Sequence, residues 1–178
     1  MKHLETKLLT GLELHRRVIL EAVLKAQRYV WIATANLKDM HIPTAQGFRP
    51  ILEVFDQMAD AGVSFRIVHS DMPSRSFQKT LERFPRLTAG ALELQICPRS
   101  HWKMVIADGH SAYFGSANFT GAGLGSKSEH RRNLELGIFS TAPMLLKRLQ
   151  ELFDSFWMGL YCERCALRRQ CPAPIEAC

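Results

Sequence analysis

The chain has 178 residues, 47% of them hydrophobic and 22% charged, with a formal net charge of +6. This composition is typical of one globular domain and excludes a disordered or collagen-like chain. The basic balance favours an anionic partner, with nucleic acid first, then anionic lipid or a small phosphate ester. No apolar run is long enough to span a membrane and no signal-peptide core is present, so we expect a cytoplasmic protein.

The first half of the chain carries the patterns of an α/β domain. Apolar residues recur at helical spacing between 12 and 27, which predicts an amino-terminal helical segment over 1–27. Three short runs have the continuous or alternating apolar pattern of β-strands: 29–33, 63–67 and 92–96. A helix beginning at Pro50 and ending before Gly62 separates the first two. Strand, helix and strand with short links predict a mixed, largely parallel sheet flanked by helices.

Polar residues alternate with apolar ones in the segment His101-Trp102-Lys103-Met104-Val105-Ile106. Alternate residues of a strand share a face, so we expect His101 and Lys103 to point together while Trp102 packs against apolar groups. Asp108-Gly109 then predicts a tight hairpin, and we interpret Asp108 as a turn residue rather than a catalytic one. The hairpin would return the chain so that Ser116 and Asn118 lie near His101.

These side chains suit chemistry at phosphorus. An imidazole can attack phosphorus when its second nitrogen is held by an acceptor. An ammonium and an amide can bind the non-bridging oxygens and stabilise the charge of the transition state. A later alternating run, 133–138, places Asn133 and Glu135 opposite Leu134 and its apolar neighbours, and Glu135 would supply the acceptor. Glu129 is the weaker rival because we expect it in a loop.

The spacing His101-x-Lys103, Asp108 and Gly115-Ser116-x-Asn118 resembles the HKD motif of the phospholipase D superfamily. The short chain with a single motif is similar to that superfamily's bacterial nuclease-like branch. The step from Asn133 to Glu135 resembles its downstream acidic position. The resemblance covers roughly residues 28–157, which we expect to form the catalytic domain.

The resemblance implies a role for each matched residue. His101 would form a covalent phosphohistidine, Lys103 and Asn118 would hold the phosphate with support from Ser116, and Glu135 would accept a hydrogen bond from His101. The reaction would need no metal or other cofactor. Because the family uses two histidines and this chain has one motif, we expect a homodimer with a shared active site.

The motif leaves the substrate open. A nuclease is favoured because four basic residues lie close to the predicted site in sequence: Arg99, Lys127, Arg131 and Arg132. Hydrolysis or head-group transfer on phospholipids is one alternative. A catalytically silent nucleic-acid-binding module of a repair or defence complex is another.

The last segment, 158–178, changes abruptly to cysteine, arginine and proline. Four of its residues are candidate metal ligands: Cys162, Cys165, Cys171 and Cys178. In a reducing compartment such a cluster favours a structural zinc ion or iron–sulfur cluster over disulfides. Because Cys178 is the last residue, Cys97 is an alternative fourth ligand.

Overall fold

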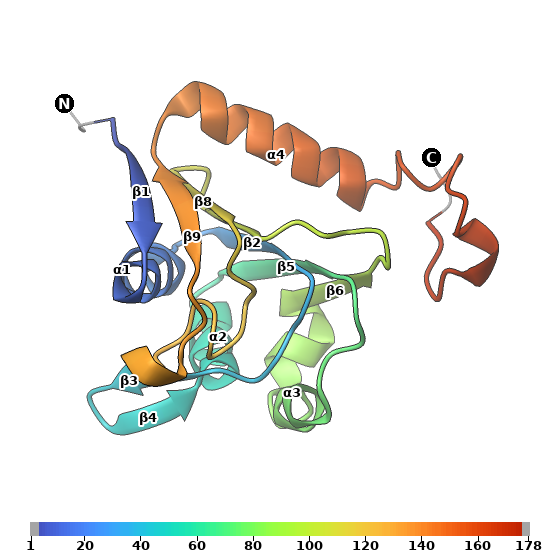
Figure 1. Ribbon diagram of the computed structural model, residues 1–178. Coiled ribbons are helices and arrows are strands. Elements are labelled where there is room, and N and C mark those ends of the chain that lie inside the picture. The colour runs from blue at the N-terminus through green and yellow to red at the C-terminus, as the bar shows by residue number, and fades with distance from the viewer. Residues whose placement is uncertain (1–3, 176–178) are drawn as a thin grey trace.

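The computed structural model describes residues 4–175, and a seven-stranded sheet forms its centre (Figure 1). Its strands are β1 (Thr6–Thr10), β2 (Tyr29–Thr34), β5 (Ser64–His69), β6 (Leu92–Ile96), β7 (Met104–Ala107), β8 (Ser111–Gly115) and β9 (Leu136–Ser140). A small separate sheet pairs β3 (His41–Thr44) with β4 (Gly47–Pro50). The three strands expected at 29–33, 63–67 and 92–96 are therefore confirmed as β2, β5 and β6.

The order of the sheet is β1-β9-β8-β7-β2-β5-β6. β5 pairs in parallel with β2 and with β6, whereas the other neighbouring pairs are antiparallel. A mixed α/β sheet flanked by helices is confirmed, but the expectation that it is largely parallel is wrong. The parallel part stops at β2, because the hairpin between β7 and β8 and the returning β9 and β1 extend the sheet with antiparallel pairs.

Helices cover both faces of the sheet. The α-helices are α1 (Leu12–Leu14), α2 (Ile51–Asp60), α3 (Arg75–Leu81) and α4 (Pro143–Trp157). Other helical turns are π-helical at His15–Leu20 and Leu87–Ala91, and 3₁₀ at Val23–Lys25, Glu129–Arg131 and Arg168–Gln170. None of the helices within residues 4–175 combines the length and the apolarity needed to cross a lipid bilayer.

Two apolar cores result, one on each face. The larger core joins α1, α2 and α3 to the sheet, and within it Phe55 of α2 stacks on Phe65 of β5 with ring centroids 4.2 Å apart. α4 lies along the opposite face (Figure 1), where Phe153 packs on Trp31. Met104 and Ile106 belong to this smaller core, and Trp102 packs against it, as their alternation predicts.

The amino-terminal segment is part of this domain rather than a helical unit before it. Residues 6–10 form β1, which pairs with β9 at the edge of the main sheet. Leu9 of β1 and Leu14 of α1 are fully buried in the larger core. The sequence pattern misses β1 because the strand is short and its partner β9 lies more than a hundred residues later.

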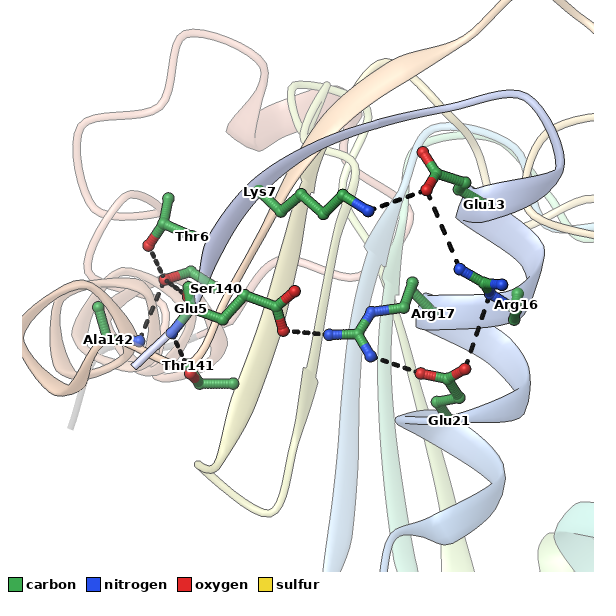
Figure 2. Close-up of polar contacts among 10 residues, drawn as sticks. All are labelled: Glu5, Thr6, Lys7, Glu13, Arg16, Arg17, Glu21, Ser140, Thr141 and Ala142. Carbon is green, nitrogen blue, oxygen red and sulfur yellow. Dashed lines mark hydrogen bonds and ion pairs between the residues drawn. The ribbon is translucent and has the colours of Figure 1, made fainter. Parts of the chain in front are cut away.

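A polar network fastens β1 to the first helix and to β9 (Figure 2). Arg17 donates hydrogen bonds to Glu5, just before β1, and to Glu21, while its guanidinium lies 4.8 Å from the ring centroid of Phe139. Thr6 and Ser140 are joined across the two strands by a hydroxyl pair 2.7 Å apart. These polar contacts stabilise the edge strand β1, in which Leu9 is the one buried residue.

Replacing Arg17 by methionine is expected to lower the free energy of unfolding by about 1–2 kcal/mol, because two ion pairs and a cation–π contact are lost. The side chain of Arg17 is only 23% exposed, so solvent weakens these contacts less than usual. Arg16→Met is the matched control, since Arg16 is 60% exposed and reaches Glu21 at 3.7 Å. Urea unfolding followed by circular dichroism measures both, and equal losses would contradict the role of Arg17.

Asp108 is the turn residue that the sequence predicts, and it also anchors a second segment. Both Asp108 and Gly109 have positive φ, in the turn between β7 and β8. The carboxylate accepts hydrogen bonds from the backbone N–H groups of Gln27 and Arg28, each at 2.8 Å, and of Tyr29 at 2.9 Å. Burial opposes ionisation of Asp108, but these hydrogen bonds outweigh it and lower its pKa.

Asp108→Asn is expected to cost about 1–2 kcal/mol of stability at neutral pH, because a neutral amide is a weaker acceptor for three N–H groups. A lowered pKa in the folded state stabilises the protein above the unfolded pKa of about 4 and loses that effect as pH falls. The difference between wild type and variant should therefore shrink below about pH 4. Urea unfolding at several pH values tests this, with the exposed Asp71→Asn as control; a difference that persists in acid would contradict it.

Candidate active site

The sequence-predicted polar residues meet at the edge of the sheet where β2 and β5 end. β7 is antiparallel to β2, with Met104 opposite Ala33, so the residues just before β7 lie beside the carboxyl end of β2. His101 and Lys103 occupy this position and precede β7, rather than lying within a strand as expected. The antiparallel ladder begins only at Met104, although the backbone of Lys103 still accepts a hydrogen bond from Gly115.

His101 and Lys103 are in direct contact. The ammonium of Lys103 lies 3.1 Å from each ring nitrogen of His101 and donates to the backbone carbonyl of His101 at 2.9 Å. The imidazole is exposed and Lys103 is half-buried. An accessible imidazole beside a fixed positive charge is what attack on an anionic phosphodiester requires.

The segment before His101 is tied to the end of β5. The hydroxyl of Ser70 donates to the carbonyl of Ser100, and the backbone N–H of Cys97 donates to the carbonyl of His69 at 2.8 Å. Ser100 itself is only 4% exposed. Hydrogen bonds to the end of β5 thus fix the backbone that precedes the exposed imidazole of His101.

Asn118 is oriented by the chain that follows β2. Its Oδ1 accepts hydrogen bonds from the backbone N–H groups of Ala35 at 3.0 Å and Asn36 at 3.2 Å, and from the hydroxyl of Thr34 at 3.2 Å. These three donors fix the amide so that Oδ1 faces the protein. The Nδ2 group makes no hydrogen bond within residues 4–175 and can donate to a ligand.

Thr34 is a positioning residue that the sequence reasoning missed. It is 1% exposed, and its hydroxyl also accepts from the N–H of Phe119 at 2.9 Å. The signal for Thr34 is its position as a polar residue at the carboxyl end of a buried strand, because ligand sites of α/β sheets lie at that edge.

Ser116 and Glu135 form a pair. The hydroxyl of Ser116 donates to one oxygen of Glu135 and the amide of Asn133 donates to the other at 3.0 Å. Within the described residues no hydrogen bond joins Glu135 to His101, so the predicted contact is absent from a single chain. Both carboxylate oxygens of Glu135 thus already have partners. β9 begins only at Leu136, so Asn133 and Glu135 lie in the loop that precedes this strand.

Glu135 nevertheless acts on the site electrostatically. Burial lowers the pKa of Lys103, and the nearby carboxylate of Glu135 partly opposes this shift. The carboxylate of Glu135 therefore offsets part of the effect of burial on the charged form of Lys103. Leu134, expected on an apolar strand face, instead lies fully exposed next to this pair.

A buried tyrosine supports the floor of the site. The hydroxyl of Tyr113 accepts a hydrogen bond from the N–H of Ala117 at 3.0 Å, and burial raises its pKa to about 12. A side chain on Gly115 would place its Cβ 2.4 Å from the carbonyl of Leu136 and 2.7 Å from this hydroxyl. The glycine before Ser116 thus lets β8 and β9 approach closely over the ring.

Of the four predicted substrate-binding residues, Arg99 and Arg132 contact other parts of the protein, whereas the other two, Lys127 and Arg131, face solvent. Arg99 turns toward the tail, where its hydrogen bond to Cys165, with help from the N–H of Leu167, lowers the pKa of that thiol. Arg132 donates to the backbone carbonyls of Gly11 at 2.9 Å and Gly123 at 3.0 Å, so it supports the loop. Lys127 and Arg131 are exposed on that loop.

Comparison with known proteins agrees with this geometry. Residues 19–157 match the family described as cardiolipin synthase, PLD-like domain, where PLD denotes phospholipase D. No curated protein matches the chain by sequence. The mixed sheet flanked by helices agrees with this match. The chain belongs to the phospholipase D-like domain family.

Solved structures share the fold at low sequence identity. NucT from Helicobacter pylori superposes with a TM-score of 0.61 at 13% identity, covering 87% of this chain and 96% of its own. Nuc from Salmonella typhimurium, a phospholipase D family member, gives 0.59 at 17%, covering 87% and 95%. The archaeal chromatin protein TrmBL2 gives 0.57 at 16%, covering 85% of this chain. This chain spans about half of TrmBL2, 51%.

Proposed function

We propose that this protein is a phosphodiesterase that cleaves nucleic acid through a covalent phosphohistidine on His101. The observation that carries the proposal is the contact of the exposed His101 imidazole with Lys103, at the edge where Asn118 presents an oriented amide donor. A nucleophile, a fixed cation and a hydrogen-bond donor around one open position are the parts that phosphoryl transfer needs.

The reaction proceeds in two displacements. A ring nitrogen of His101 attacks phosphorus, the bond from phosphorus to the leaving oxygen breaks, and a second group donates a proton to that oxygen. Water then attacks the phosphohistidine, the same second group takes the proton of the water, and the phosphorus–nitrogen bond breaks. Lys103 and Asn118 hold the non-bridging oxygens through both steps, while Glu135 and Ser116 hold the neighbouring loop.

The second group is His101 of another copy of this chain. One chain carries one HKD motif, so the acid must come from a two-fold partner. Exposed apolar side chains flank Glu135: Leu134 is 105% exposed and Leu136 56%. Such a patch next to a polar site is typical of an association surface. Sedimentation should find a dimer at micromolar concentration, and a monomer that retains full activity would overturn the shared site.

Nucleic acid is the favoured substrate because of the charged loop beside the site. Lys127 and Arg131 extend from it into solvent, and the structural relatives include nuclease-named proteins. Glutamine at either position should weaken DNA binding and reduce the slope of log affinity against log salt by about 1. Lys147→Gln on α4 is the control, and an equal effect there would argue against a local contact with phosphates.

Two other functions have a supporting observation each. The matched family is described as cardiolipin synthase, PLD-like domain, which favours a phospholipid substrate. TrmBL2, a DNA-binding chromatin protein by its description, has a similar fold, which favours binding without cleavage. Parallel incubation with single- and double-stranded DNA, RNA and cardiolipin-containing liposomes in excess EDTA separates the three. We expect cleavage of nucleic acid, and products from liposomes alone would overturn that choice.

A further inference from the structure

Four cysteines from two distant parts of the chain line a single cavity of about 200 Å³. Cys97 follows β6, whereas Cys162, Cys165 and Cys171 lie in the segment after α4. All four are partly buried, and none forms a disulfide. The tail, which extends from the end of α4 in Figure 1, thus brings its cysteines to the segment that precedes β7.

Packing and hydrogen bonds give the tail a defined path around this cavity. Phe156 near the end of α4 contacts Trp102 with ring centroids 5.4 Å apart and Tyr161 at 6.0 Å. Arg168 donates to the carbonyls of Cys162 at 3.2 Å and Ile175 at 3.0 Å, which closes the tail on itself. The cysteines therefore face the cavity because of the fold of the tail.

Positive charge accompanies the sulfurs. Arg99 and Arg168 line the same cavity as the four cysteines. Four thiolates around one divalent cation leave a net negative charge, which neighbouring guanidinium groups would offset.

We propose that Cys97, Cys162, Cys165 and Cys171 bind one thiophilic metal centre, either a zinc ion or an iron–sulfur cluster. A closed set of four sulfur ligands is typical of structural centres. Among residues 4–175, no three His, Cys, Asp or Glu side chains yet stand close enough to share an ion. Binding therefore draws the tail cysteines toward Cys97, in a segment made of short turns. Cys178, the other candidate ligand, lies outside the described residues.

The centre would also brace the active-site segment. Cys97 precedes His101 by four residues, and the N–H of Ser100 donates to the carbonyl of Cys97 at 2.9 Å. Trp102, between His101 and Lys103, lines the same cavity. A metal held by Cys97 would thus fix one end of the segment 97–102, in which His101 directly precedes Trp102.

Metal analysis of the intact protein tests the site without using activity. Protein expressed with added zinc and iron and purified without oxygen should contain one metal centre per chain. Zinc without colour indicates a single ion, and iron with sulfide and a visible absorbance band indicates a cluster. Protein that folds but contains neither metal would overturn the proposal, whatever its phosphodiesterase activity.

Serine variants identify the fourth ligand. Cys162→Ser and Cys97→Ser should each lower the metal content at least about tenfold, since each removes a thiolate from the coordination shell. Cys178→Ser is the matched control and should retain the metal. Loss in Cys178→Ser with retention in Cys97→Ser would overturn the assignment to this cavity.

A measurement on the wild type covers the case in which a variant fails to fold. Alkylation of the native protein followed by mass spectrometry should label Cys178 and spare the four cavity cysteines. Removal of the metal with a chelator should then make all five reactive. Equal labelling of all cysteines before chelation would contradict the site, as would disulfides that survive purification without oxygen.

Discussion

His101→Ala is expected to reduce phosphodiester cleavage by about 10⁴- to 10⁶-fold, the loss usually found when a covalent nucleophile is removed. His101 is exposed, and its ring hydrogen bonds among the described residues go to Lys103, so stability should change by less than about 0.5 kcal/mol. The loss should appear in kcat, because the bond that His101 forms exists only along the reaction path. Initial rates on a labelled oligonucleotide in excess EDTA measure it.

The control for this variant is His110→Ala. His110 is also exposed, in the turn at the other end of β7, and should leave the rate unchanged within about twofold. Adding a large excess of His101→Ala protein to the wild type is a second control. If two copies share one site, mixed dimers form and the rate per wild-type chain falls. A His101→Ala variant that keeps wild-type turnover would remove the proposed nucleophile.

Gly115→Ala is expected to lower the free energy of unfolding by about 3 kcal/mol or more, the upper range for overpacking a rigid site. The new Cβ would stand 2.4 Å from the carbonyl of Leu136 and 2.5 Å from Cα of Gly137, both backbone atoms. β8 and β9 would have to separate, and that movement would also displace Ser116. Chemical unfolding should therefore show a large decrease in midpoint.

Gly121→Ala is the matched control, because the nearest atom to its added Cβ is the flexible Cε of Lys127 at 3.6 Å. Its stability should change by less than about 1 kcal/mol. The two variants differ in the room available for the added Cβ, which meets backbone atoms at Gly115 and a flexible side chain at Gly121. Equal stability of the two variants would show that the strands separate more easily than their packing suggests.

The elements that could be predicted are those whose signal is local. β2, α2, β5 and α4 each bury apolar residues at their own period, so a short window of sequence contains the information. The excess of antiparallel pairs in the sheet could not be predicted in the same way. β1, for example, joins the sheet through β9, which lies more than a hundred residues later in the sequence.

The candidate site shows the same division. His101, Lys103 and Asn118 were predicted because their spacing is fixed by a hairpin whose turn residues are visible in the sequence. The contacts of Arg132 and Arg99 could not be predicted. Charge alone does not distinguish a solvent-facing guanidinium from one bound to backbone carbonyls or to a cysteine. Glu135 is an intermediate case: it lies near Lys103 as a partner of the site, but its oxygens bind Ser116 and Asn133.

The most direct test of this account is to trap the covalent intermediate. Wild-type protein mixed with a labelled oligonucleotide in excess EDTA and quenched within one turnover is predicted to carry a phosphoryl-linked nucleotide on the peptide that contains His101. The adduct should be acid-labile, as a phosphorus–nitrogen bond is, and absent from His101→Ala. Rapid cleavage with no adduct on His101 at any time during turnover would contradict the account.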